Sequence, residues 1–384
     1  MSGYEVFRRD VSGGVHTRVE KYTKFSATLR MNEVGKWSIS GRGEGCPFHA
    51  GDGISVLRDG AAFLSGTVTE VSEELDESYA GRSLVSWTAD GVDDNGLIFR
   101  RAIVPDPVGL DFTAASHQVL TDYGGNAILR FIDSQGGEGA HAGRRLPNFG
   151  ADAAKNYGTV ETFKARFQNV WEYVAEIAKK QGLRVYVLRG NDGRYTATVS
   201  VPTDKSNVII FSREFGTLKR WTRKVSAPKA NAVWVVGQGE LTARMVSYRE
   251  DPASIARWGR IEVIKDRRDI SNEQQANDPR TPQEILDEAA ETFLAEAQAT
   301  EGYELELTEN PRMVYRRDWD LGDVVSVRAG TAVFNAPVTE VRIDYGAGLE
   351  TVYPTVGTIQ RGTLGKTYGT IQELRKRLDI LERV

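Results

Sequence analysis

The sequence predicts an α+β protein that is mostly β, with two related β-sandwich or barrel domains, an inserted small α/β domain and a short C-terminal helix. Three observations predict this class: short alternating runs between Gly, Asp and Asn turns, a central segment with helical spacing, and a hairpin that occurs twice. The hairpin reads GDGISVLRDGAAFLSGTVTEV at residues 51–71 and GDVVSVRAGTAVFNAPVTEV at 322–341. We therefore expect related β domains near the two ends of the chain.

Composition and charge exclude several classes of protein. The chain has 384 residues, 40% apolar and 27% charged, which is ordinary for a globular protein of several domains. The formal net charge of −4 gives no basic field that would recruit nucleic acid or an anionic membrane. The single cysteine, Cys46, excludes an internal disulfide framework and thiolate-rich zinc sites. No secretion signal or membrane span is recognisable, so we expect synthesis and folding in a reducing cytosol.

The first β domain is expected to cover residues 1–105. Its alternating runs are separated by turn residues, and Asp59-Gly60 is a good hairpin turn because both residues tolerate positive φ. Pro105 and Pro107 are expected to form the joint to the next domain. The predicted strands are 17–20, 26–31, 37–40, 54–57, 63–71 and 83–89.

Residues 106–205 are expected to form the inserted α/β domain. A short helix is predicted over 123–133, and a longer helix over 160–178, where apolar residues recur every three or four positions. Gln181-Gly182 is the expected end of the longer helix. A hairpin of strands 183–188 and 195–201 follows it.

The second β domain is expected to cover residues 206–365 and to carry one helix at 282–298. Thr281-Pro282-Gln283-Glu284 predicts the start of that helix, because it combines a capping box with Pro at the first helical position. The last segment, 366–384, is predicted to be a short helix. Its apolar residues at heptad spacing are expected either to form an axial contact in a trimer or to dock on the chain's own body. They are Ile371, Leu374, Leu378 and Leu381.

The repeated hairpin is the main candidate functional feature. Its recurring positions are Gly51, Asp52, Phe63, Val68 and Glu70 in the first copy, and Gly322, Asp323, Phe334, Val338 and Glu340 in the second. A generic hairpin could produce part of this pattern, but the identical Val-Thr-Glu-Val favours duplication of a domain. Three chains with two equivalent domains each would close a ring of six similar units, which can join a sixfold tube to a threefold structure.

No group of residues in the sequence has the spacing of a known catalytic or metal-binding motif. The histidines are scattered, without the paired spacing of a zinc peptidase. The Gly-rich stretch 41–45 is expected to be a plain loop, because no helix follows it that could hold a phosphate. We therefore predict no enzyme activity, no cofactor and no metal. The histidines are His16, His49, His117 and His141.

Two groups of side chains have structural interpretations. The carboxylates of Asp318, Asp320 and Asp323 could bind a cation or act as a glycosidase pair, but are expected to be turn residues. Residues 73–77, rich in Glu and Asp, are expected to be a solvated loop. A carbohydrate-binding protein would show clustered exposed aromatics, whereas the tryptophans beside predicted strands are expected to pack inside. They are Trp37, Trp87, Trp234 and Trp319.

Several stretches, in their order along the chain, resemble the tail-tip (baseplate) hub proteins of long-tailed bacteriophages, particularly the siphophage hub family of actinobacterial phages. Each stretch alone is weak, and none is a catalytic signature. They are Trp37-Ser38-Ile39, the Gly51-Asp52 hairpin, Phe99–Pro105, Val201–Ser206, Phe211-Ser212, Trp258–Glu262 and Asp318–Asp323.

The resemblance implies a homotrimer whose two tube-like β domains form a pseudo-sixfold ring in the tail tip of the virion, after synthesis in the bacterial host cytoplasm. Its implied partners are the distal tail protein, the tape measure protein and tail fibre or spike proteins, and phage DNA would pass through without specific binding. The acidic balance of the chain fits such a conduit, because each DNA phosphate neutralised by Lys or Arg would add affinity of the lumen for DNA. The alternatives are the baseplate hub of a contractile injection system or tailocin, and a tail-associated cell-wall hydrolase.

Overall fold

The structure is a computed structural model that describes residues 3–10, 16–43, 45–76, 84–111, 113, 115–190, 192–273, 280–308 and 313–357. The predicted C-terminal helix, with Ile371, Leu374, Leu378 and Leu381, lies outside these residues. The chain divides into two compact units, which we describe separately. Unit 1 comprises Met1–Trp221 and Glu304–Val356, and unit 2 comprises Thr222–Tyr303 and Gly357–Val384.

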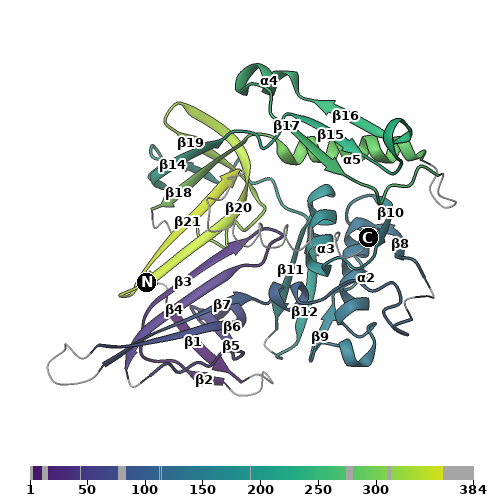
Figure 1. Ribbon diagram of the computed structural model, residues 1–384. Helices are drawn as coiled ribbons and strands as arrows, with labels where there is room; N and C mark the ends of the chain where they lie inside the picture. Colours follow the sequence, from purple (N-terminus) through teal and green to yellow (C-terminus); the bar gives the residue numbers. More distant parts are fainter. Residues whose placement is uncertain are drawn as a thin grey trace. The chain divides into compact units, whose positions relative to one another are not determined.

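A large, mainly antiparallel sheet lies mostly in unit 1, and 13 strands are assigned to it in the described residues. Strands β14 and β18 extend across the bounds of unit 1 into unit 2. Its main path runs β14-β18-β21-β20-β3-β4-β7-β6-β5-β1-β2, and β19 pairs with both β13 and β20. The purple strands of the first hundred residues therefore lie beside the yellow strands of the last fifty (Figure 1). The predicted mostly β class is confirmed. The strands are β1 Tyr4–Arg9, β2 His16–Arg18, β3 Tyr22–Arg30, β4 Lys36–Gly43, β5 Gly53–Arg58, β6 Ala61–Asp76, β7 Leu84–Asp93, β13 Ile210–Ser212, β14 Leu218–Ser226, β18 Thr300–Leu307, β19 Val324–Ala329, β20 Ala332–Gly346 and β21 Leu349–Gly357.

Glycines in this sheet make room for two tryptophans. Trp37 on β4 crosses β7 and β6, and a Cβ on Gly91 would lie 2.2 Å from its Cζ2 atom. Trp87 on β7 crosses β4, where a Cβ on Gly41 would lie 2.4 Å from the corresponding ring atom. Both tryptophans are 3% exposed, as predicted. The indoles therefore lie flat on the sheet only because these positions lack side chains.

The hairpin turn between β5 and β6 has the predicted geometry. Asp59 and Gly60 have φ values of 52° and 79°, the left-handed region that tight hairpin turns use. The sequence stretches expected to be loops on either side differ from the structure. Gly41–Gly43 belongs to β4, and Glu73–Asp76 belongs to β6. The predictions of a plain loop at 41–45 and of an acidic loop at 73–77 were therefore wrong.

An α/β part lies between β7 and β13 in the chain and is also in unit 1. Helices α2 and α3 pack against each other and against short sheets, with Ile128, Phe131, Trp171 and Val174 in the shared core. The elements are α1 Asn95–Phe99, β8 Gln118–Tyr123, α2 Gly124–Gly136, the 3-10 turn η1 Ala142–Arg144, β9 Phe149–Ala151, β10 Val160–Ala165, α3 Val170–Lys180, β11 Arg184–Arg189 and β12 Tyr195–Ser200.

The predicted helix over 160–178 is correct only in its second half. Val160–Ala165 forms strand β10, antiparallel to β8, and helix α3 begins at Val170 after Asn169 caps it. Phe163 and Ala165 are buried at strand spacing. Phe167 has a φ of 56°, which interrupts regular structure between the two elements. The predicted stop is confirmed, because Gly182 has a φ of 65° after the helix end.

Unit 2 contains a three-stranded sheet with one long helix on a single face. Helix α5 packs on the sheet through Leu286 and Ala290, which contact the core around Val233 and Val235. The capping box of Thr281 and Glu284 forms as predicted. The elements are β15 Ala232–Val236, η2 Leu241–Ala243, β16 Val246–Glu250, α4 Pro252–Trp258, β17 Glu262–Asp266 and α5 Pro282–Ala297.

The opposite face of this sheet carries exposed apolar side chains. Trp234 is 38% exposed and packs against Tyr248 in a tilted arrangement, with ring centroids 4.4 Å apart. The expectation that Trp234 packs inside was therefore wrong, whereas Trp319 is buried as expected. Among the residues described, no helix combines the length and apolarity needed to cross a membrane.

Candidate assembly surfaces

The two hairpins of the sequence have the same backbone geometry. Gly51 and Gly322, which precede the first strand of each hairpin, have φ values of 94° and 90°. Val68 donates to the carbonyl of Asp52 at 2.8 Å, and Val338 donates to that of Asp323 at 3.0 Å. The reciprocal bonds, from Gly51 and Gly322 to the valine carbonyls, measure 2.9 and 2.8 Å.

A buried aspartate fixes each turn. Asp52 and Asp323 are each 6% exposed. The Oδ2 atom of Asp52 accepts from the backbone N–H of His49 at 2.8 Å, and that of Asp323 accepts from Asp320 at 2.8 Å. Each carboxylate also meets a basic side chain, Arg8 at 3.6 Å and Lys205 at 2.9 Å. These cations lie far away in the sequence and were not predicted.

The second strand of each hairpin contains an irregularity at the same place. The register of β6 against β7 shifts between Val68 and Glu70, and that of β20 against β21 shifts between Val338 and Glu340. Both shifts fall inside the identical Val-Thr-Glu-Val. A bulge bends a strand, and each long strand changes its main partner near this point. Strand β6 pairs with the short β5 before the bulge and with the longer β7 after it, and β20 pairs with β19 before it and with β21 after it.

The two phenylalanines do not occupy equivalent positions. Leu64 pairs with Val56, and Phe334 pairs with Val327, so Leu64 is the counterpart of Phe334. Phe63 lies at a second irregularity, is 4% exposed and packs edge-on against Tyr4 at 5.4 Å.

The equivalence extends to five strands. The first set has the spatial order β5-β6-β7-β4-β3, and the second has the order β19-β20-β21-β18-β14. The chain visits both sets in the same sequence, since β3, β4, β5, β6 and β7 correspond to β14, β18, β19, β20 and β21. We call each set a five-strand unit.

The two five-strand units join through β3 and β20. Seven residues of each pair antiparallel, from Glu340 opposite Arg30 to Gly346 opposite Lys24. Arg30 Nε donates to Glu340 Oε2 at 2.6 Å, and both side chains are largely shielded, at 16% and 25% exposure. A charge-assisted hydrogen bond in such a place is stronger than an exposed ion pair.

Of the aspartates near the second hairpin, Asp320 contacts the α/β part and Asp318 bonds to its own turn. Asp320 accepts from Arg184 Nη1 at 2.8 Å. Although burial opposes ionisation, this guanidinium holds the pKa of Asp320 below its ordinary value. Asp318 accepts from the N–H of Val314 at 2.7 Å. These contacts agree with the predicted turn role. Across the described residues, no group of three or more His, Cys, Asp or Glu is arranged to hold a metal ion.

Two adjacent carboxylates, Asp93 and Asp94, are buried where β7 meets α1. Burial raises the pKa of Asp93 to about 7 and that of Asp94 to about 6. Asn95 Nδ2 donates to Asp93 at 3.1 Å, and the Ser65 hydroxyl donates to Asp94. Arg9, 2% exposed, lies close enough to favour the charged form of Asp94 and also contacts Tyr195 of the α/β part.

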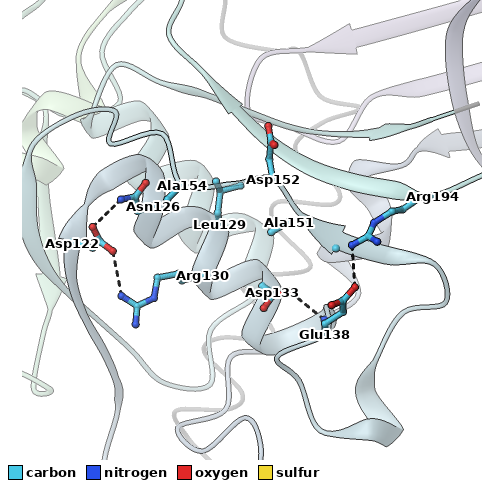
Figure 2. A pocket seen from close by; sticks show the side chains of 11 residues that line it. Asp122, Asn126, Leu129, Arg130, Asp133, Glu138, Ala151, Asp152, Ala154 and Arg194 are labelled. Carbon is cyan, nitrogen blue, oxygen red and sulfur yellow. Dashed lines mark hydrogen bonds and ion pairs between the residues drawn. The ribbon is translucent and has the colours of Figure 1, made fainter. Parts of the chain in front are cut away.

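A groove of about 320 Å³ opens between α2 and the β9–β12 edge (Figure 2). Four of its charged side chains form two ion pairs, Arg130 with Asp122 at 3.2 Å and Arg194 with Glu138 at 3.0 Å. The paired side chains are mostly well exposed, so the groove has the character of a solvated surface.

The fold is shared with tail proteins of known structure. The 43 kDa tail protein of prophage MuSo2 from Shewanella oneidensis aligns with a TM-score of 0.57 and 13% identity, over 92% of this chain and 98% of that one. The tail protein from Neisseria meningitidis gives 0.56 and 13%, over 93% and 97%. The prophage tail protein gp18 from Listeria monocytogenes gives 0.52 and 9%, over 97% and 99%. No curated protein matches the sequence.

The sequence assigns the family. Residues 9–358 match the family described as Siphovirus ReqiPepy6 Gp37-like protein, and this range includes both five-strand units, the α/β part and the sheet of unit 2. The predicted resemblance to phage tail proteins is confirmed by this match together with the shared fold. The chain belongs to the Siphovirus ReqiPepy6 Gp37-like protein family.

Proposed function

We propose that this chain is a structural hub of a phage tail tip, assembled as a homotrimer. The observation that carries this proposal is the repetition of the five-strand unit, with the same glycine, buried aspartate and bulge in each copy. Membership of a siphovirus family and a fold shared with three tail proteins support it. We further propose that the units arose by duplication, within β domains spanning residues 1–105 and 206–365.

Three chains with two units each form a ring of six similar units around a threefold axis. One side of such a ring matches a sixfold tail tube, and the other side presents three equivalent sites. The C-terminal segment, with Ile371, Leu374, Leu378 and Leu381 at heptad spacing, extends the trimer along its axis in this proposal.

The hub joins the distal tail protein and tape measure protein on one side to fibre or spike proteins on the other. It acts as a virion component without enzymatic activity, and it lets DNA pass during ejection. The net charge of −4 supports a passage role, because DNA gains no counterion-release affinity for a lumen without an excess of Lys and Arg. A continuous Lys and Arg belt facing the lumen of the assembled ring would contradict it.

Antibody labelling of purified particles tests the location. The proposal predicts label at the tail end distal to the capsid, and loss of adsorption-competent tails when the gene carries a stop codon. Label along the tail shaft, or particles that assemble complete tails without the protein, would refute the hub role.

A further inference from the structure

The two five-strand units differ at one edge of their long strands. In the second five-strand unit, Glu340–Gly346 of β20 pairs with β21 on one side and with β3 on the other. In the first five-strand unit, the corresponding segment is Glu70–Asp76 of β6, which pairs with β7. Among the strands of the described chain, none pairs with the other edge of this segment. The first five-strand unit therefore has an open edge along β6, at the place where β3 pairs with β20 in the second five-strand unit.

Strand β14, the counterpart of β3, ends the sheet. It has one neighbour in the sheet, β18, so its outer edge is also open within the part of the chain that the structure describes. Leu218 is its one buried residue, whereas β3 buries Phe25, Ala27 and Leu29. Val225 is 40% exposed. A long exposed edge strand with apolar side chains is a template for pairing with another chain.

The two open edges carry opposite charges. Lys219 and Arg220 both contact Glu306, yet their side chains remain 69% and 72% exposed. The side chains of Glu70 and Glu74 are exposed on β6. In total β14 carries Lys219, Arg220, Arg223 and Lys224, and the open segment of β6 carries Glu70, Glu73, Glu74 and Asp76.

We propose that β14 of one chain pairs antiparallel with Glu70–Asp76 of β6 in a second copy of the chain. The pairing would reproduce between chains what β3 and β20 do within one chain, with Glu70 in the place of Glu340. Because each chain offers one basic edge and one acidic edge, the contact is head-to-tail and closes only as a ring. This inference rests on the proposed trimeric hub and names the interface that builds it.

Charge reversal tests the interface in the purified full chain. The variant Glu70→Lys/Glu74→Lys puts cations opposite the basic edge, and Lys219→Glu/Arg223→Glu puts carboxylates opposite the acidic edge. Each variant is expected to shift the oligomer to monomer, seen by light scattering as a threefold loss of mass. Combining all four substitutions restores opposite charges and the oligomer. The matched control Glu20→Lys/Glu138→Lys reverses two exposed charges elsewhere and keeps the oligomer.

Cysteine cross-linking gives a second readout that does not depend on affinity. In a Cys46→Ser background, Ser72→Cys is combined in turn with Arg223→Cys, Lys224→Cys or Val225→Cys, and the chain is oxidised, because the register of β3 and β20 would place Lys224 opposite Ser72. Neighbouring antiparallel strands bring one such pair within disulfide distance, so a covalent three-chain species is expected.

The outcomes separate this inference from the proposed function. A trimer that survives both charge reversals and yields no cross-linked species overturns the β14–β6 interface but leaves the trimeric hub standing. A chain that is monomeric before any substitution overturns both.

Discussion

Replacing Asp93 by Asn should stabilise unit 1 at alkaline pH. Burial raises the pKa of Asp93 from 3.8 to about 7, so the folded protein holds this proton where the unfolded chain has released it. The free energy of unfolding therefore falls as pH rises from about 4 to about 7. Each unit of pKa shift is worth about 1.4 kcal/mol, so at pH 8 the ionisation of Asp93 lowers the free energy of unfolding by at most about 4 kcal/mol. Asn removes this charge and its cost.

Urea unfolding followed by tryptophan fluorescence measures the effect, since Trp37 and Trp87 are buried in the same sheet. At about pH 8 the midpoint of Asp93→Asn should exceed that of the wild type, and at about pH 4.5 the two should approach each other. Asp90→Asn on the same strand is the matched control. A wild-type midpoint that rises between about pH 5 and 8, or a variant with the wild-type pH slope, would refute the reasoning.

Four further substitutions test the packing and the repeat. Gly91→Ala places a Cβ 2.2 Å from Trp37 and should cost about 3 kcal/mol or more, measured by urea unfolding. Gly322→Ala and Gly51→Ala both force a side chain into φ near 90°, so each should cost about 1–2 kcal/mol, with a further cost at 322 because the new Cβ would lie 3.2 Å from Pro202 Cγ. An unchanged midpoint for either variant would argue against this turn geometry. Leu286→Ala leaves a cavity at a fully buried position of α5, where the helix packs on the sheet, and should cost about 3 kcal/mol, seen as loss of unit 2 hydrogen-exchange protection.

The sequence predicted features that depend on local chemistry. The Asp59-Gly60 turn and the Thr281 capping box are set by the residues themselves, because positive φ and side-chain capping need particular residue types. The shared Val-Thr-Glu-Val marked the bulge of both long strands. Its function in changing strand partners could not be read from the sequence, since the partners lie far along the chain.

Other features depend on tertiary context and were missed. The segment 160–178 satisfies a helical spacing, but Val160–Ala165 pairs with β8 and becomes a strand, since its buried residues also fit a period of two. Strand β14 was not predicted because it has no alternation of buried and exposed residues. The elements from β15 to α5 separate β14 from β18 in the chain, which hid the correspondence with the hairpin of β3 and β4.

Native mass spectrometry of the purified chain, together with imaging of the same particle, tests the central claim most directly. The account predicts a mass of three chains and a closed ring with six similar lobes, two from each chain. A single chain, a closed twofold dimer, or a trimer with only three lobes at the ring would contradict the equivalence of the two five-strand units.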